Sequence, residues 1–198
     1  SGCTSLKEIT LPSGTTELGA GSFSGCTSLK EIDIPKGVKE IQESMFSGCA
    51  MLNRVGIEEN DSITYIASQA FAYCASLETI TLPPNLKELG TEVFQGTGIQ
   101  SITIPKTVTE CSWNGAFHGA NSLKKVIFED GMETIPDWCL YESTVSEVVI
   151  PGTVTRIGKC AFADCKNIEE ITLPSGITEL GVDSFSGCTS LKVITLPS

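Results

Sequence analysis

Apolar residues recur along this chain in two short groups, and the pair of groups returns about every 23 residues. The first group reads Leu-x-x-Ile-x-Leu, as in Leu6, Ile9 and Leu11, and its Ile-x-Leu alternation is typical of a short strand with one buried face. A second pair, such as Leu18 with Phe23, follows on the way to the next copy. Each copy therefore predicts one strand and one return segment, both with an inward apolar side.

Proline closes the first group in most copies and ends the strand, because proline has no amide proton for a sheet ladder. The return segment is too short for a full α-helix, so we expect turns, 3₁₀ or one-turn helices there, with room for a second short strand. Stacking the copies in parallel predicts one sheet along the whole array, with strands about 4.8 Å apart. The closing prolines are Pro12, Pro35, Pro83, Pro105, Pro151, Pro174 and Pro197.

One small residue, most often cysteine, stands at the same position in every copy, and we call it the marker. Successive markers are 23, 23, 25, 23, 23, 23, 22 and 23 residues apart. A period this regular is the signature of a repeat solenoid, in which each repeat buries its apolar side only against its neighbours. We therefore expect residues 1–198 to form a single β-rich solenoid of eight repeats and a partial ninth. The markers are Cys3, Cys26, Cys49, Cys74, Thr97, Ala120, Ser143, Cys165 and Cys188.

Charge and hydropathy exclude two classes of partner. The formal net charge is −11, the isoelectric point is near 4.5, and the 13 lysines and arginines are spread along the repeats rather than clustered. Such a surface repels the phosphate backbone, so we expect no nucleic-acid partner. No run approaches the roughly 18 apolar residues of a membrane span, so we expect no membrane insertion.

The chain begins and ends inside a repeat, at Ser1 and Ser198, and shows neither a signal peptide nor a polar terminal cap. We therefore expect it to be a fragment of a longer protein. Uncapped repeat ends expose the apolar edge of a coil, which predicts end-to-end stacking of chains.

The motif Leu-x-x-Ile-x-Leu-Pro followed by Ile-Gly-x-x-x-Phe-x-x-Cys runs from Ile168 to Cys188, with Leu180 in place of the second Ile. It resembles the leucine-rich repeat of BspA-type bacterial surface proteins, and the resemblance covers the whole chain. It implies a right-handed curved solenoid with one parallel sheet on the concave face. For the family it also implies secretion or display on the cell surface and adhesion to host or microbial partners, although one fold serves many functions.

Six of the nine cysteines hold the marker position, where other copies have Thr97, Ala120 and Ser143. Small volume is the property these residues share, so a buried ladder of small residues is favoured. Side chains of parallel neighbours point the same way, which opposes the torsion of a disulfide. We therefore predict nine free thiols.

The other three cysteines lie outside the marker position. Cys111 takes a return-path apolar position and is expected in the core, whereas the pattern leaves the exposure of Cys139 and Cys160 open. Cys160 and Cys165 lack the second cysteine pair or the histidine that a zinc site requires. We expect no metal or other cofactor.

No catalytic constellation is visible, so we expect no enzyme activity. The single histidine, His118, follows Phe117 at a turn position, and an exposed turn is favoured over a catalytic base. No nucleophile elbow or phosphate-binding loop occurs. The acidic insertion Glu58–Asp61 carries four oxygen-bearing side chains, but it lacks the alternating spacing and glycine of a calcium loop. A solvated loop is favoured there, and Ca²⁺ binding stays the alternative.

Departures from the repeat consensus gather between Thr97 and Ser143, and they define a candidate partner-binding region. This interval lacks marker cysteines, replaces the closing proline with Glu129, and carries an extra residue between Cys111 and Asn114. Aromatic residues that the core does not require are enriched in interfaces, whereas sequence drift in a tolerant array is the alternative. The candidates are Trp113, His118, Lys125, Ile127, Trp138, Tyr141, Glu147 and Val149.

These candidates fall into two predicted groups. On the sheet face, Ile127 and Val149 should form a small apolar patch in adjacent copies, edged by Lys125 and Glu147. On the turn side, His118 and Tyr141 should lie about one strand spacing apart, with Trp138 two residues before Leu140, which takes the phenylalanine position. The sequence thus favours a non-enzymatic module, secreted or on the cell surface, that binds a protein or glycan. A structural spacer that displays another domain is the alternative.

Overall fold

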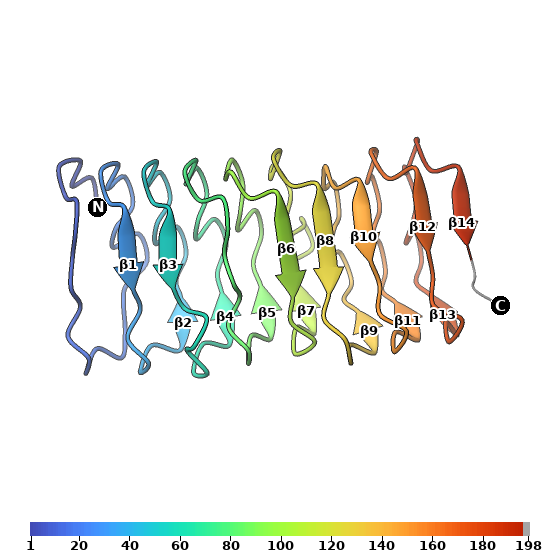
Figure 1. Ribbon diagram of the computed structural model, residues 1–198, viewed down its shortest axis with the longest axis horizontal. Coiled ribbons are helices and arrows are strands. Elements are labelled where there is room, and N and C mark those ends of the chain that lie inside the picture. The colour runs from blue at the N-terminus through green and yellow to red at the C-terminus, as the bar shows by residue number, and fades with distance from the viewer. Residues whose placement is uncertain (196–198) are drawn as a thin grey trace.

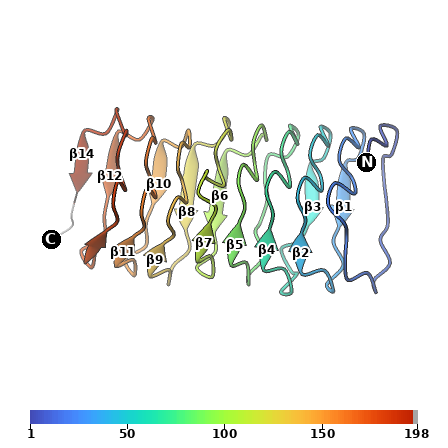
Figure 2. The ribbon, with the colours of Figure 1, turned by 180° about the vertical axis from the view of Figure 1, so that it is seen from behind.

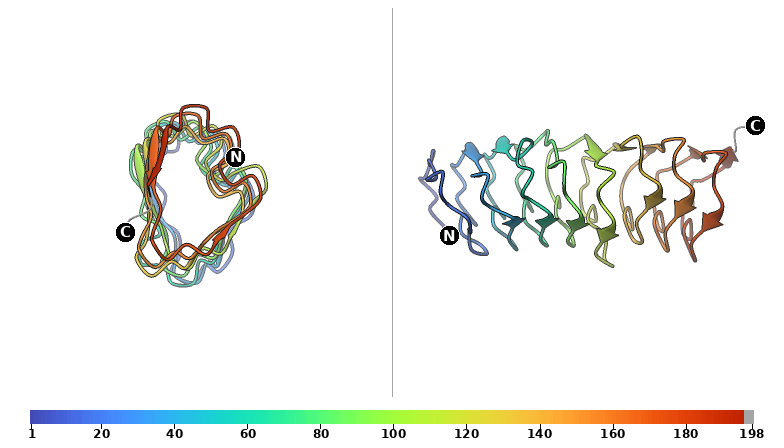
Figure 3. Two further views of the ribbon diagram at one scale, coloured as in Figure 1. Left: turned by 90° about the vertical axis from the view of Figure 1, so that its right-hand side faces the viewer. Right: turned by 90° about the horizontal axis from the view of Figure 1, so that it is seen from below.

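The computed structural model describes residues 1–195 and shows a solenoid of stacked parallel-strand coils. We number the coils by sequence copy, each running from one marker residue to the next. The coils form one rod, with the N-terminus and the last described strand at opposite ends (Figure 1). Seen end-on, they superimpose around a shared interior (Figure 3). The predicted leucine-rich-repeat solenoid is confirmed.

The first strand of each copy lies in one row along the front of the rod (Figure 1). The register is the predicted one, since Ile32 pairs with Val55, and Ile102 with Val126. These central residues are buried and the flanking ones face outward. The strands of this row are β1 (Glu31–Asp33), β3 (Arg54–Gly56), β6 (Ser101–Ile104), β8 (Lys125–Phe128), β10 (Glu147–Val149), β12 (Glu170–Thr172) and β14 (Val193–Thr195).

Hydrogen bonding divides this row into three sheets, β1-β3, β6-β8-β10 and β12-β14. The copy between β3 and β6 contributes no strand at Thr79–Thr81. That copy follows the acidic insertion Glu58–Asp61 and leaves its strand path through Pro83 and Pro84, neither of which donates an amide proton. Pro197 lies outside the described residues.

The return path carries a second row of two-residue strands, which Figure 2 shows from behind. They form two sheets, β2-β4-β5-β7 and β9-β11-β13. The second short strand is therefore confirmed. These strands are β2 (Glu40–Ile41), β4 (Tyr65–Ile66), β5 (Glu88–Leu89), β7 (Glu110–Cys111), β9 (Thr134–Ile135), β11 (Arg156–Ile157) and β13 (Glu179–Leu180).

The expected 3₁₀ or one-turn helices are wrong, because residues 1–195 contain turns and strands but no helix. Two residues with left-handed φ bracket each phenylalanine of the return path, as Ser44 and Gly48 bracket Phe46. Left-handed residues interrupt a right-handed helix. The amides donate instead to the next coil, for example Phe46 N to Ala70 O at 2.8 Å. The turns thereby form a third ladder along the rod.

The interior is filled by leucine, isoleucine, valine and phenylalanine. Phenylalanine rings stack from coil to coil at centroid distances of 5.5 to 5.9 Å, and the stack ends where Leu140 replaces phenylalanine. In that coil Phe128 takes a position that other copies give to leucine or isoleucine, and its ring meets Phe162 edge-on at 6.4 Å. The stacked rings are Phe23, Phe46, Phe71, Phe94 and Phe117.

The marker residues from Cys26 to Cys165 form a buried ladder inside the rod, as predicted, whereas Cys3 is exposed and Cys188 is partly buried at the two ends. Their thiols also act as donors, since Cys49 Sγ donates to Phe23 O at 3.0 Å and Cys74 Sγ to Phe46 O at 3.1 Å. Four marker cysteines thus donate to the carbonyl three residues before the preceding marker, a role that small volume alone did not indicate. All nine cysteines are unpaired in the structure, and both Cys139 and Cys160 are buried.

Candidate functional site

Along the described part of the chain, one joint on the return side lacks both the strand ladder and the turn ladder. Within residues 1–195, no backbone hydrogen bond joins Thr109–Gly119 of coil five to Glu133–Glu142 of coil six, and β7 does not pair with β9. We call this joint the seam. On the front row the same coils remain joined, because all four residues of β6 pair with β8. The two coils therefore meet along one face and are not hydrogen-bonded along the other.

Two sequence features account for the seam. In coils three, four, five, seven and eight, the residue after the second strand donates its amide to the preceding coil, as Ala67 N does to Ile41 O and Gly158 N to Ile135 O. Pro136 occupies this position in coil six and has no proton to donate. The extra residue of coil five also shifts its turn by one position, so that Glu92 N bonds to Gly115 O.

Both tryptophans of the chain lie at the seam. Trp113 stands in the turn that carries the extra residue and is 72% exposed. Trp138 is partly buried, with its ring edge-on to Tyr141 at a centroid distance of 5.1 Å. Lys159 Nζ lies 5.4 Å from the centre of the Trp138 ring. The two tryptophans line one shallow groove.

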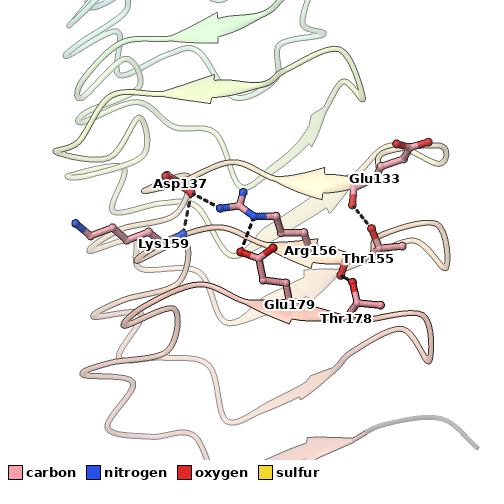
Figure 4. Close-up of polar contacts among 7 residues, drawn as sticks. All are labelled: Glu133, Asp137, Thr155, Arg156, Lys159, Thr178 and Glu179. Carbon is pink, nitrogen blue, oxygen red and sulfur yellow. Dashed lines mark hydrogen bonds and ion pairs between the residues drawn. The ribbon is translucent and has the colours of Figure 1, made fainter.

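Three charged residues also line this groove, together with uncharged residues of both coils. The charged residues are Glu110, Asp137 and Arg156, and the uncharged ones are Thr109, Cys111, Thr134 and Pro136. Arg156 reaches across three coils, with Nε 3.0 Å from Glu179 Oε1 and Nη2 3.6 Å from Asp137 Oδ1 (Figure 4). Asp137 Oδ1 also accepts a hydrogen bond from Lys159 N at 2.8 Å. The carboxylate of Asp137 is therefore held by two partners, and the groove presents both hydrogen-bond donors and acceptors.

His118 is held between two carboxylates rather than lying free in an exposed turn. Its Nδ1 is 3.1 Å from Glu92 Oε1 and its Nε2 is 3.3 Å from Glu142 Oε2. The ring thus links coils four, five and six, and its contact with Glu142 crosses the seam. Next to it, Gly115 packs so closely on Tyr141 that an added Cβ would lie 2.5 Å from the Tyr141 carbonyl oxygen. The turn side is therefore in tight contact despite the missing ladder.

The remaining candidates lie on the front row, on a different face from the seam. Glu147 pairs in register with Lys125, and Val149 with Ile127. Lys125 Nζ is 2.5 Å from Glu147 Oε1, while Val149 is 40% exposed and Ile127 is partly buried. The predicted neighbours are confirmed, but the structure separates the eight candidates into two surfaces.

Sequence reasoning missed Pro136, Asp137 and Arg156. The sequence did contain one indication, because Pro136 takes a repeat position where other copies have glycine, alanine, serine or glutamine. The contacts of Arg156 carried no such signal, because they join residues 19 and 23 positions apart whose proximity follows only from the coil register.

The remaining surface offers two further features. The amide of Asn60 donates to Pro35 O at 3.0 Å and accepts from Ser62 N at 3.1 Å, so this side chain of the acidic insertion shapes the turn rather than facing an ion. A second shallow groove lies on the front row beside Ile80, Thr103 and Lys106 and contains no aromatic side chain.

Among the described residues, no group of three or more His, Cys, Asp or Glu side chains is arranged to hold a metal ion. Over the same range, none of the chain is a helix long and apolar enough to cross a membrane.

Stacked coils with short parallel strands and a leucine-, isoleucine- and phenylalanine-filled interior define a leucine-rich-repeat protein. The family model described as "BspA type Leucine rich repeat region" matches in six copies, over residues 1–114 and 113–198. The chain therefore belongs to the BspA-type leucine-rich repeat family. The two matched segments meet at 113–114, where coil five carries its extra residue.

Solved structures give the same fold. A leucine-rich repeat protein from T. pallidum is 25% identical with a TM-score of 0.62, over 92% of this chain and 76% of that one. One from Eubacterium ventriosum is 19% identical with a TM-score of 0.55, over 94% and 59% of the two chains. A search of curated protein sequences gave no match.

Proposed function

We propose that this chain is a non-enzymatic interaction module of a secreted or cell-surface bacterial protein and that it binds its partner, a protein or glycan, at the seam. Membership of the BspA-type family supports the surface location. The seam supports a binding site, because both tryptophans lie there. Trp113 is 72% exposed, so its side chain does not serve to pack the core. Tryptophan is enriched among the residues that dominate binding energy.

The fold itself supports a binding role over catalysis. The only histidine is engaged by Glu92 and Glu142, and the buried marker thiols donate to backbone carbonyls. Neither group is presented to a substrate. A solenoid instead offers an extended rigid surface, which suits recognition of a large partner.

Binding of the labelled chain to intact epithelial cells and intact bacteria tests this function. We expect saturable binding that Trp113→Ala reduces at least about tenfold, since truncating a dominant contact costs more than 1 kcal/mol. The matched control is Ile127→Thr with Val149→Thr, which gives the front row the residue most common there and leaves the seam intact. Loss of binding in this control alone would move the site to the front row. Absence of saturable binding to every surface would favour the spacer.

A further inference from the structure

We propose that the seam is a groove for a neutral polysaccharide, with Trp113 and Trp138 stacking on sugar rings and Glu110, Asp137 and Arg156 bonding to hydroxyls. This inference rests on the proposed function and names the chemical class of its ligand. The groove lies between two stretches that run side by side without hydrogen bonds, Thr109–Trp113 and Thr134–Trp138.

The aromatic groups fit a sugar. One face of a pyranose ring presents C–H bonds with partial positive charge, and the face of an indole ring is negative, so the two attract when stacked. Trp138 is fixed in place, because Tyr141 meets it edge-on and Lys159 lies over its ring. Trp113 extends from the opposite side of the groove and is 72% exposed. The groove therefore has one rigid aromatic wall and one accessible aromatic platform.

The polar groups fit hydroxyls. A sugar hydroxyl both donates and accepts, so it matches a surface where carboxylates and a guanidinium alternate. Asp137 and Arg156 are already oriented by their contacts with Lys159 N and Glu179, which lowers the entropic cost of binding. Glu110 lies on the exposed side of β7 at the edge of the groove.

Charge selects a neutral polysaccharide over an acidic one. Around the groove, the carboxylates of Glu110, Asp137 and Glu179 outnumber the cations of Arg156 and Lys159, and Arg156 is paired with two of those carboxylates. The chain as a whole carries a net charge of −11. A uronic-acid or sialic-acid polymer would therefore be repelled.

The groove also has the shape for a chain of sugars. It is bounded by two stretches of five residues each, in which β7 and β9 supply the extended part. The groove is open to solvent along the return side, so an internal segment of a polymer can bind in it.

Tryptophan fluorescence of the full chain tests this inference directly, because the chain has two tryptophans and both lie at the seam. The probes are oligosaccharides of β-glucan, mannan and N-acetylglucosamine, with polygalacturonate as the acidic comparison. We expect at least one neutral probe to give a saturable change of emission and polygalacturonate to give none. Trp113→Ala should weaken the binding at least about tenfold, and Glu110→Gln, on the solvent side of β7, several-fold.

Tyr73→Ala is the matched control, because Tyr73 is an exposed aromatic residue in a turn of coil three, away from the seam. It should bind like the wild type. A chain that binds cells but no neutral oligosaccharide would overturn the ligand class and leave the proposed function standing. Oligosaccharide binding that Trp113→Ala and Glu110→Gln do not change would overturn the site. Absence of binding to both cells and oligosaccharides would overturn the proposed function itself.

Discussion

Pro136 stands in coil six where Ser112 stands in coil five, and only Ser112 is bonded to the coil before it, with Ser112 N 3.0 Å from Leu89 O. An alanine, glycine or serine at this position donates its amide proton to the previous coil, whereas a proline has no proton to donate. Pro136 and the extra residue of coil five thereby separate two return-path sheets, β2-β4-β5-β7 and β9-β11-β13, and the chain's two tryptophans lie at that separation.

Closing the seam should stabilise the chain and abolish its groove. We predict that deleting Asn114 together with Pro136→Ala restores the regular phase and returns about two backbone hydrogen bonds. This should raise the free energy of unfolding by about 1–2 kcal/mol, measured by urea denaturation. Pro136→Ala without the deletion is the control and should give a smaller gain. A double variant that is less stable than the wild type would show that the seam is not an interrupted ladder.

Restoring the consensus phenylalanine in the core of coil six should destabilise the chain. Because Phe128 is larger than its counterparts and Leu140 smaller, the two substitutions compensate in volume. We predict that Leu140→Phe destabilises the chain by about 1–3 kcal/mol through overpacking. Phe128→Ile in the same chain should recover most of that loss. Additive destabilisation by the two changes in thermal or urea unfolding would contradict this compensation.

The features that recur from coil to coil could be predicted from the sequence, whereas features that occur in only one coil could be predicted only in part. Strand register, the buried markers and the inward Ile-x-Leu residues recur in many copies, so each copy supported the others. The effect of Pro136 occurs once, and the contacts of His118 join residues 24 and 26 positions away, so no repeated pattern revealed them. The missing helices had a similar cause, because left-handed φ at residues such as Gln69 and Trp138 is set by bonding to the next coil.

The buried thiols should make the chain less stable in alkali. Burial raises the pKa of Cys49 to about 11 and raises the pKa of Cys74 and Cys165 further. The hydrogen bond with Cys111 and complete burial raise the pKa of Cys139. Thiols of the unfolded chain ionise near pH 8.5, so stability is full below that pH. It then falls as the pH rises toward the folded values, by about 1.4 kcal/mol per pH unit for each thiol that ionises only when unfolded.

Urea unfolding at several pH values between 7.5 and 10.5 measures this loss. Cys49→Ala should show a shallower decline than the wild type, because it has one fewer thiol to ionise. Lysine and tyrosine titrations are common to both chains and cancel in the comparison. Equal slopes for the two chains would contradict the assignment.

The last coil should promote self-association. Val182 is 69% exposed and Ile194 is 47% exposed at the C-terminal end of the rod. We predict that sedimentation of the 198-residue chain depends on concentration and that Val182→Lys with Ile194→Lys removes the dependence. Val149→Lys, midway along the rod, is the control and should leave it unchanged. A wild-type chain that stays monomeric at all concentrations would refute end-to-end stacking.

Amide hydrogen exchange measured residue by residue tests the seam most directly, because it reports the missing ladder without any ligand. Phe117 and Gly119 have no backbone partner across the seam, whereas Phe71 N bonds to Val93 O at 3.0 Å and Phe162 N to Ser184 O at 2.9 Å. We predict that Phe117 and Gly119 exchange at least about tenfold faster than Phe71 and Phe162. Equal protection at all four amides would show that coils five and six are joined like the others and would contradict the account.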